Sequence, residues 1–127
     1  MVECYAPLLD SCASPSLCYY DFHIGNILAE RRHGALELTG ILDLENAIAG
    51  DPLMDIAKTL SYSVRGNPAK KAGLLAGYGP VGRPDWHQTL ELYELYGVLE
   101  LWCWWKQIGD HQHAASLMPD LERLAGG

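Results

Sequence analysis

Three oxygen-bearing side chains near the amino end of the chain constrain its fold more than any other feature. Asn26 follows Asp21 with four residues between them, and Asp43 comes at the end of the next apolar segment. Phosphoryl transfer asks little covalent chemistry of a protein, but it needs a carboxylate at the acceptor hydroxyl and hard oxygen ligands for magnesium. The order and spacing of these residues therefore predict that they converge in a site for phosphoryl transfer.

The residues between Asn26 and Asp43 predict the frame that brings the three side chains together. Apolar segments at 27–28 and 36–44 indicate the two strands of a hairpin. Gly25 allows the chain to turn tightly beside Asn26. We therefore expect Asn26 and Asp43 at the base of this hairpin, facing Asp21.

Residues 17–60 resemble the aminoglycoside phosphotransferase family of kinase-like small-molecule phosphotransferases. The family pattern is His-Gly-Asp-x-His-x-Gly-Asn, then Ile-Asp, then Gly-Asp-Pro and a further Asp. This chain has Tyr-Tyr-Asp-Phe-His-Ile-Gly-Asn, Leu-Asp and Gly-Asp-Pro-Leu-Met-Asp in the same order. The resemblance implies an α+β fold, namely a mostly helical protein-kinase-like C-terminal lobe with a small catalytic β-hairpin. It also implies transfer from ATP, or another nucleoside triphosphate, to a small-molecule hydroxyl with Mg²⁺ as cofactor.

The resemblance also assigns roles to individual residues. It makes Asp21 the catalytic base and Asn26 and Asp43 the metal ligands, and it makes His23 and Gly25 supports of the loop that carries Asp21. It assigns no residue to the nucleotide.

Two further aspartates and one tyrosine are expected to support that loop. Asp51 precedes Pro52 and is typical of a helix N-cap. Asp55, one turn later, is expected to tie the helix to the loop by accepting backbone N–H bonds. Tyr19 occupies the position where the family has a histidine that braces the loop, so the geometry of the loop depends on what Tyr19 does instead.

The length of 127 residues predicts one domain, residues 1–127. In the resembled family a strand-rich N-terminal lobe, which clamps the nucleotide, precedes the site. Here the loop starts at residue 19, and we expect that lobe to be absent. The alternative to an enzyme is then a truncated, non-catalytic lobe that acts as a binding or interaction module. Either a homodimer or a separate N-terminal lobe would cover the apolar floor that such a lobe exposes, around residues 17–20 and one of Trp104 or Trp105.

The net charge of −7 narrows the classes of partner. Nucleic acid and anionic membranes both attract basic surfaces, so neither is expected. A cationic acceptor fits this charge, and an antibiotic whose phosphorylation gives resistance is one candidate. No apolar run has the length of a membrane span, and the start of the chain lacks the basic residues of a secretory signal, so we expect a cytoplasmic protein. The four cysteines form no C-x-x-C pair and are expected to be reduced, partly buried thiols.

The rest of the chain predicts helices separated by glycine- and proline-rich breaks. The expected order is a helix over 1–13, a strand over 17–20, and helices over 53–63, 69–76, 85–108 and 113–124. The G-x-G-x-x-G match at 77–82 is expected to be only a connection between helices, because no strand precedes it. In the long helix one apolar stripe is expected to form the core: Leu90, Tyr93, Gly97, Leu101, Trp104 and Ile108.

Three features leave alternatives open. Glu45 either lies near the metal ligands or faces water. One of Trp104 and Trp105 must face away from the stripe, where it would form a pocket wall or a contact with another lobe. His111 and His113 suggest a zinc site, but a solvated turn is the better interpretation, because His-x-His side chains diverge on a helix.

Overall fold

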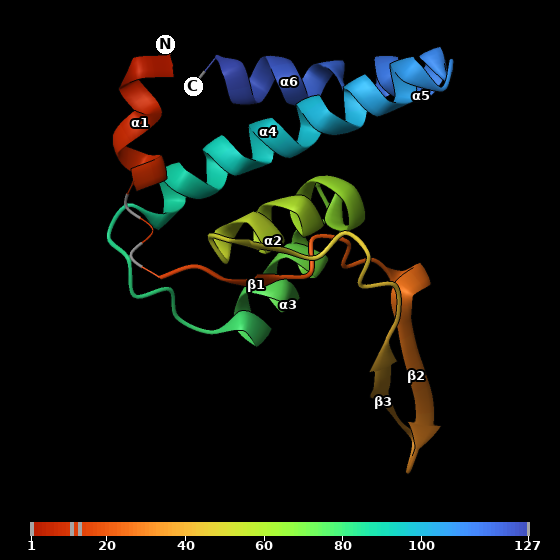
Figure 1. Ribbon diagram of the computed structural model, residues 1–127. Coiled ribbons are helices and arrows are strands. Elements are labelled where there is room, and N and C mark those ends of the chain that lie inside the picture. Colours follow the sequence, from red (N-terminus) through yellow and green to blue (C-terminus); the bar gives the residue numbers. More distant parts are fainter. Residues whose placement is uncertain (1, 11, 13, 127) are drawn as a thin grey trace.

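The computed structural model describes residues 2–10, 12 and 14–126, and its fold is α+β, as predicted (Figure 1). A body of helices carries a β-hairpin that extends away from it. The helices are α1 (Val2–Asp10), α2 (Leu53–Thr59), α3 (Pro68–Tyr78), α4 (Trp86–Gln107), α5 (His111–Ser116) and α6 (Met118–Ala125). No helix in this described part combines the length and the apolar character needed to cross a bilayer.

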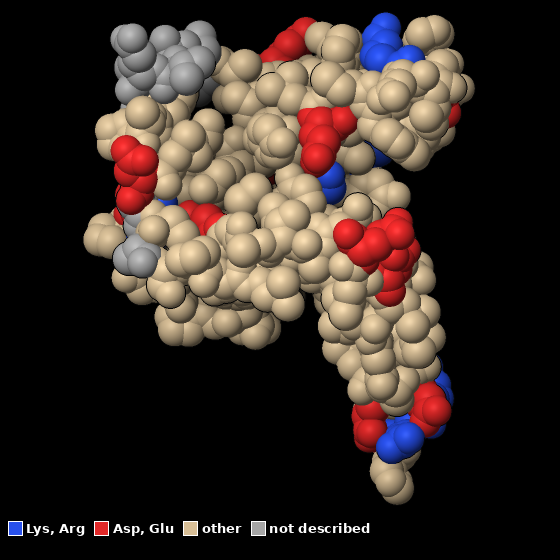
Figure 2. Space-filling view, viewed as in Figure 1, with Lys and Arg blue, Asp and Glu red and all other residues tan. Residues whose placement is uncertain are grey.

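The predicted hairpin forms from β2 (Ile27–Arg32) and β3 (Ala35–Ile41), which pair antiparallel. The turn contains His33 and Gly34, both at positive φ, as a two-residue type I′ hairpin turn requires. The second strand also ends earlier than predicted, at Ile41 instead of residue 44. Figure 2 shows the hairpin as a projecting arm with its charged side chains gathered near the far end.

A second, smaller strand pair holds the start of the site. Strand β1 (Ser16–Cys18) pairs antiparallel with β4 (Ile48–Gly50), a strand that the sequence analysis missed. The predicted strand over 17–20 is therefore too long, because Tyr20 has a φ of 65° and leaves the extended conformation. Cys18 is fully buried and its thiol donates to the Asp51 carbonyl at 3.3 Å.

The described cysteines, Cys12, Cys18 and Cys103, are free thiols, as predicted. Cys103 is exposed, however, so the expectation of partial burial is wrong for that residue.

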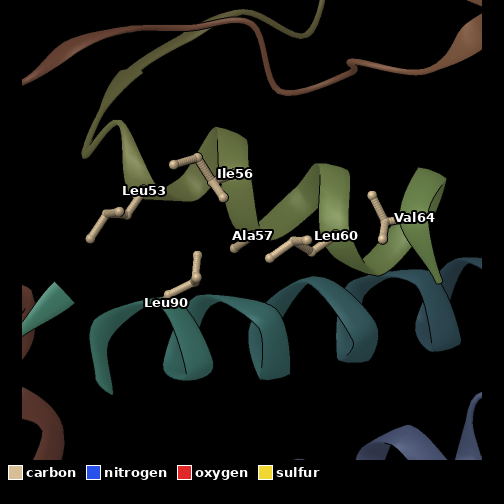
Figure 3. Close-up of a cluster of buried hydrophobic side chains, with 6 residues drawn as sticks. All are labelled: Leu53, Ile56, Ala57, Leu60, Val64 and Leu90. Carbon is tan, nitrogen blue, oxygen red and sulfur yellow. The ribbon is translucent and has the colours of Figure 1, made fainter. Parts of the chain in front are cut away.

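The main core lies between α2 and α4 (Figure 3). Its buried side chains are Leu53, Ile56, Ala57, Leu60, Val64 and Leu90. The two helices come close where Gly97 faces Ser61, since a Cβ on Gly97 would lie 3.3 Å from the Ser61 hydroxyl. Helix α2 continues into a π-helix, η2 (Leu60–Val64), so the predicted helix over 53–63 exists but changes its hydrogen-bonding pattern in its last turn.

The predicted stripe on α4 is only partly correct. Leu90, Gly97 and Leu101 are buried as expected, but Trp104 and Ile108 are exposed. Trp102 and Trp105 instead pack against a second buried cluster, which consists of Val98, Leu101 and Leu117. The reason is that α5 and α6 fold back along α4 and cover a different face of its last turns (Figure 1).

The carboxyl-terminal region differs from the single helix predicted over 113–124. It forms two helices, α5 and α6, which meet at Leu117. His111 and His113 belong to α5, so the interpretation as a solvated turn is wrong. Asp110 caps this helix by accepting the His113 N–H at 3.0 Å. The segment 77–82 does connect two helices, α3 and α4, as predicted.

Candidate active site

Asp21 and Asn26 contact each other in a loop that we define as residues 19–26, the Asp21 loop. The Asn26 amide nitrogen donates to Asp21 Oδ2 at 3.1 Å and to the Asp21 carbonyl at 3.2 Å. These bonds fold the loop back on itself, so that the predicted base and one predicted metal ligand are neighbours. The Asp21 side chain stays about a quarter exposed (24%), as a group that meets a substrate requires.

His23 and Gly25 shape the tight end of the Asp21 loop. His23 caps the short 3₁₀ helix η1 (Ile24–Asn26), where its Nδ1 accepts the Gly25 N–H at 3.1 Å. Its Nε2 lies 3.6 Å from Asp21 Oδ1. A Cβ on residue 25 would come within 2.9 Å of the His23 ring, so any other residue there would displace this ring.

Leu42, the residue before Asp43, is bonded to the Asp21 loop. The Leu42 N–H donates to the Asn26 carbonyl at 2.9 Å, at the base of the hairpin. Asp43 itself has a φ of 59°, in the left-handed region that aspartate tolerates better than most residues. Strained backbone of this kind is concentrated at functional sites in proteins.

Tyr19 braces the same junction in the position where the family pattern has histidine. Its hydroxyl donates to the Leu42 carbonyl, immediately before Asp43. Burial raises the pKa of Tyr19, a hydrogen bond with Asn26 lowers it, and the negative charges of Asp21 and Asp43 raise it further.

Asp55 anchors the Asp21 loop to α2. Its carboxylate accepts the Tyr19 N–H at 2.8 Å and the Tyr20 N–H at 2.5 Å, the contacts expected from the sequence. Tyr20 has positive φ, so these bonds hold a conformation that a tyrosine does not prefer.

Asp51 has a different set of partners. It accepts the Leu53 N–H at 3.0 Å, which caps the start of α2, and its other oxygen contacts Arg83 and Tyr93. Asp51 thus supports the helices beneath the site, while Asp55 contacts the loop directly.

A cavity of about 470 Å³ opens beside Asp21. Its lining residues come from the Asp21 loop, the segment after β3, α2, η2 and α4: Tyr20, Asp21, His23, Glu45, Asn46, Lys58, Tyr62, Glu100, Leu101 and Trp104. Three carboxylates and one ammonium group line it, so the cavity is acidic. It is large enough for a small molecule that presents a hydroxyl to Asp21.

The structure bears on two of the alternatives that the sequence left open. Glu45 lines the cavity together with Asp21 and is also exposed to solvent. Trp104 also lines it and is 47% exposed, whereas Trp105 stacks on His113 with ring centroids 4.5 Å apart. Trp104 is therefore the pocket-wall residue of the pair.

Sequence reasoning missed Lys58, Tyr62 and Ser63. Lys58 forms an ion pair with Glu100, and its ammonium lies 4.8 Å from the centre of the Tyr20 ring. The Ser63 hydroxyl donates to the Phe22 carbonyl at 2.9 Å, and the Tyr62 ring packs against His23. Helical spacing gives the missing signal, because Asp55, Lys58 and Tyr62 follow one another at intervals of three and four residues and so share one face.

The described residues contain no group of three or more His, Cys, Asp or Glu side chains arranged to hold a metal ion. His111 and His113 lie on α5, and His113 pairs with Asp110. The set predicted from the sequence consists of two carboxylates and one amide, Asp21, Asp43 and Asn26. Because the Asn26 amide nitrogen donates a hydrogen bond to Asp21, the amide oxygen is the atom that could bind a cation.

Comparisons with known proteins place the chain in a family. Searches of curated proteins and of solved structures each gave no match. The model of the family described as "APH: Phosphotransferase enzyme family" matches residues 2–92. This range includes the Asp21 loop, the hairpin, Asp51 at the cap of α2 and Asp55 within α2. The matched region covers well over half of the sequence, and the chain belongs to the phosphotransferase enzyme family.

Proposed function

We propose that this chain is the C-terminal lobe of a kinase-like enzyme that transfers the γ-phosphoryl group of ATP, or of another nucleoside triphosphate, to a hydroxyl of a small molecule. One observation carries the proposal: Asp21 lines a cavity of substrate size and also contacts Asn26. A residue in that position can meet an acceptor on one side and the phosphate-binding groups on the other.

In this proposal Asp21 is the catalytic base. The acceptor hydroxyl enters the cavity and gives its proton to the Asp21 carboxylate as its oxygen bonds to the γ-phosphorus. The bond between that phosphorus and the bridging oxygen breaks, and the nucleoside diphosphate leaves. His23, 3.6 Å from the other Asp21 oxygen, keeps the carboxylate oriented.

Asn26 and Asp43 would hold Mg²⁺ in the complete site. The donor set fits this ion, because magnesium prefers hard oxygen ligands and usually takes only one or two carboxylates from the protein and the rest from phosphates and water. When bound, the ion would neutralise charge on the transferred phosphoryl group. Two bonds support this assignment, because one ties Asn26 to the base and the other ties Leu42, the residue before Asp43, to Asn26.

A cationic acceptor is the class that the cavity favours. Asp21, Glu45 and Glu100 face one ammonium group, that of Lys58, so a positive charge is attracted. Trp104 and Tyr62 add aromatic faces that also favour cations. We propose a small cationic molecule with a free hydroxyl, for which an aminoglycoside antibiotic, whose phosphorylation would give resistance, is one candidate.

A direct test joins the chain to the N-terminal lobe of a family member and measures phosphate transfer from labelled ATP to a panel of cationic alcohols. We expect transfer that Asp21→Asn lowers by about a hundredfold or more, because a general base contributes at least that factor. Asp10→Asn, a change of the same kind on the exposed surface of α1, serves as the control and should leave the rate unchanged.

Equal rates for the parent protein and Asp21→Asn would refute the role of Asp21 as the base. The complete absence of transfer, together with retained binding of the acceptor, would favour the alternative of a non-catalytic binding module. The unfused chain is expected to transfer phosphate slowly or not at all, because positioning of the nucleotide supplies most of the catalysis in this chemistry.

A further inference from the structure

A second cavity, of about 280 Å³, lies on the other side of the π-helix η2 from the Asp21 loop. It shares no lining residue with the cavity beside Asp21. Ser61 of η2 lines it, whereas Tyr62 and Ser63 of the same π-helix contact the Asp21 loop. The five-residue helix η2 therefore contacts both the Asp21 loop and the second cavity. The proposed phosphoryl transfer uses only the cavity beside Asp21.

Basic side chains from three separate elements meet at this second cavity. Arg65 follows η2, Lys71 belongs to α3 and Arg123 belongs to α6. The chain has only nine Lys and Arg residues and a net charge of −7, so three of the nine at one small hollow is a marked concentration. Such a group of cations attracts negative charge and provides several donors for oxygen atoms.

Two carboxylates also line the cavity, so the three basic side chains leave an excess of one positive charge. Asp120 is bonded to Arg123 at 3.1 Å, which leaves Arg65, Lys71 and Glu94 as the other charged groups of the lining. Glu94 is half-buried, and its burial raises its pKa, while Lys71 and Arg123 oppose that effect.

A left-handed backbone turn at the end of η2 sets the place of Arg65 at the cavity. Arg65 ends η2 in the left-handed conformation, with φ 42° and ψ 62°. A glycine adopts this conformation without strain, but an arginine does not. The strained turn holds Arg65 between η2 and α5, where its guanidinium lies 3.4 Å from the Ser116 hydroxyl.

From these contacts we propose that the second cavity binds a small oxyanion, a phosphate or a carboxylate, through Arg65, Lys71 and Arg123. The volume of about 280 Å³ is ample for a small oxyanion. Glu94 opposes the ligand, because its carboxylate repels an anion in the same space. The site does not depend on the proposed phosphoryl transfer, and it can be tested on the chain alone without nucleotide.

The test is a titration of the isotope-labelled chain with inorganic phosphate at constant ionic strength, followed by backbone NMR, and a second titration with succinate. We expect saturable shifts centred on residues 65–71 and 120–123 for at least one of the two anions. A response to phosphate alone would assign the phosphate class, and a response to succinate alone would assign the carboxylate class.

Four variants make the titration decisive. Lys71→Gln and Arg123→Gln should each weaken binding by about tenfold, the usual effect of losing one charged donor. Arg65→Gly removes the charge at a position where glycine is unstrained, so this variant should stay folded and still lose affinity. Glu94→Gln should tighten binding. Arg32→Gln, at the exposed tip of the hairpin, is the control and should change nothing.

Several results would overturn the proposal. They are shifts that do not saturate, shifts centred on the Asp21 loop, and a loss of affinity in Arg32→Gln equal to that in Lys71→Gln. A Glu94→Gln variant with unchanged or weaker binding would also overturn it, since the anion would then lie outside the cavity.

Discussion

Arg83 and Asp51 form an ion pair beneath the candidate site, with Arg83 Nη1 2.5 Å from Asp51 Oδ2. The Asp51 side chain is 4% exposed and that of Arg83 is 16% exposed. Arg83 also donates to the Leu8 carbonyl at 2.7 Å and to the Thr89 hydroxyl at 2.9 Å. This one guanidinium therefore joins α1, the cap of α2 and the start of α4.

The first prediction is that Arg83→Met destabilises the fold by about 3 kcal/mol or more, because removal of one partner leaves a buried, unpaired charge. The measurement is urea unfolding followed by circular dichroism. Replacing both partners, Arg83→Met with Asp51→Asn, should recover part of the loss. Arg32→Met removes an exposed ion pair with Glu30 and should change stability by less than about 0.5 kcal/mol. Equal effects of the buried and the exposed arginine would contradict the prediction.

The sequence was sufficient to predict contacts between residues that lie close together along the chain. Asp21 and Asn26 belong to one loop, and their side chains are in contact as expected. Asp43 follows one hairpin later, and its approach to Asp21 stays a prediction. Asp55 lies one turn after Asp51, which caps the same helix, and its contact with the loop was expected.

Contacts between distant segments were beyond this kind of reasoning. Lys58 and Glu100 pair across 42 positions, and neither residue is unusual in its own helix. Arg83 follows a glycine-rich connection that gave no hint of a buried partner. Strand β4 has only three residues, too few to show an alternating pattern. The sequence also could not show that the end of the α4 stripe is exposed, because this depends on where α5 and α6 fold back.

The second prediction concerns the anchor of the Asp21 loop. Asp55→Ala removes the acceptor of the Tyr19 and Tyr20 N–H groups and should cost about 2 kcal/mol or more, since bonds to a charged acceptor are among the stronger ones. Amide hydrogen exchange should become faster at Tyr19 and Tyr20. The Leu90 amide in the core should still exchange only through global unfolding. Asp120→Ala, on α6, provides a control for the loss of a carboxylate from an exposed pair. Unchanged exchange at Tyr19 and Tyr20 would show that the loop holds its shape without Asp55.

The third prediction is a pH dependence of stability that comes from Glu94. Burial raises its pKa above 4.5, with Glu91 and Asp120 adding to the effect and Lys71 and Arg123 opposing it. A carboxyl with a raised pKa in the folded state prefers its protonated form there. Its favourable contribution is therefore complete below pH 4.5 and is lost as the pH rises through the folded-state pKa.

Glu94→Gln tests this dependence, because glutamine stays neutral throughout. The difference in unfolding free energy between Glu94→Gln and the parent chain should grow in favour of the variant from pH 4 to pH 7, as measured by urea titrations at several pH values. Glu91→Gln, an exposed change of the same kind on α4, should show a much smaller trend. A variant that loses stability relative to the parent as the pH rises would mean that Lys71 and Arg123 outweigh burial at Glu94.

The fourth prediction is self-association through exposed apolar side chains of β1, the hairpin and α4. Leu17 is 77% exposed on β1, and Leu36 and Leu38 on the hairpin are each 69% exposed, with Trp104 about half-exposed beside the cavity. Exposed apolar side chains of this size usually bind a partner. In a concentrated solution of the protein, a second copy of the chain is available for this. We expect sedimentation at micromolar concentrations to give a mass that rises with concentration. Leu17→Glu should shift this equilibrium toward monomer, because burying the new charge is costly, whereas Met118→Glu on α6 should not. A single monomeric species at every concentration would show that this surface is stable in water by itself, and it would leave a separate N-terminal lobe as the proposed partner.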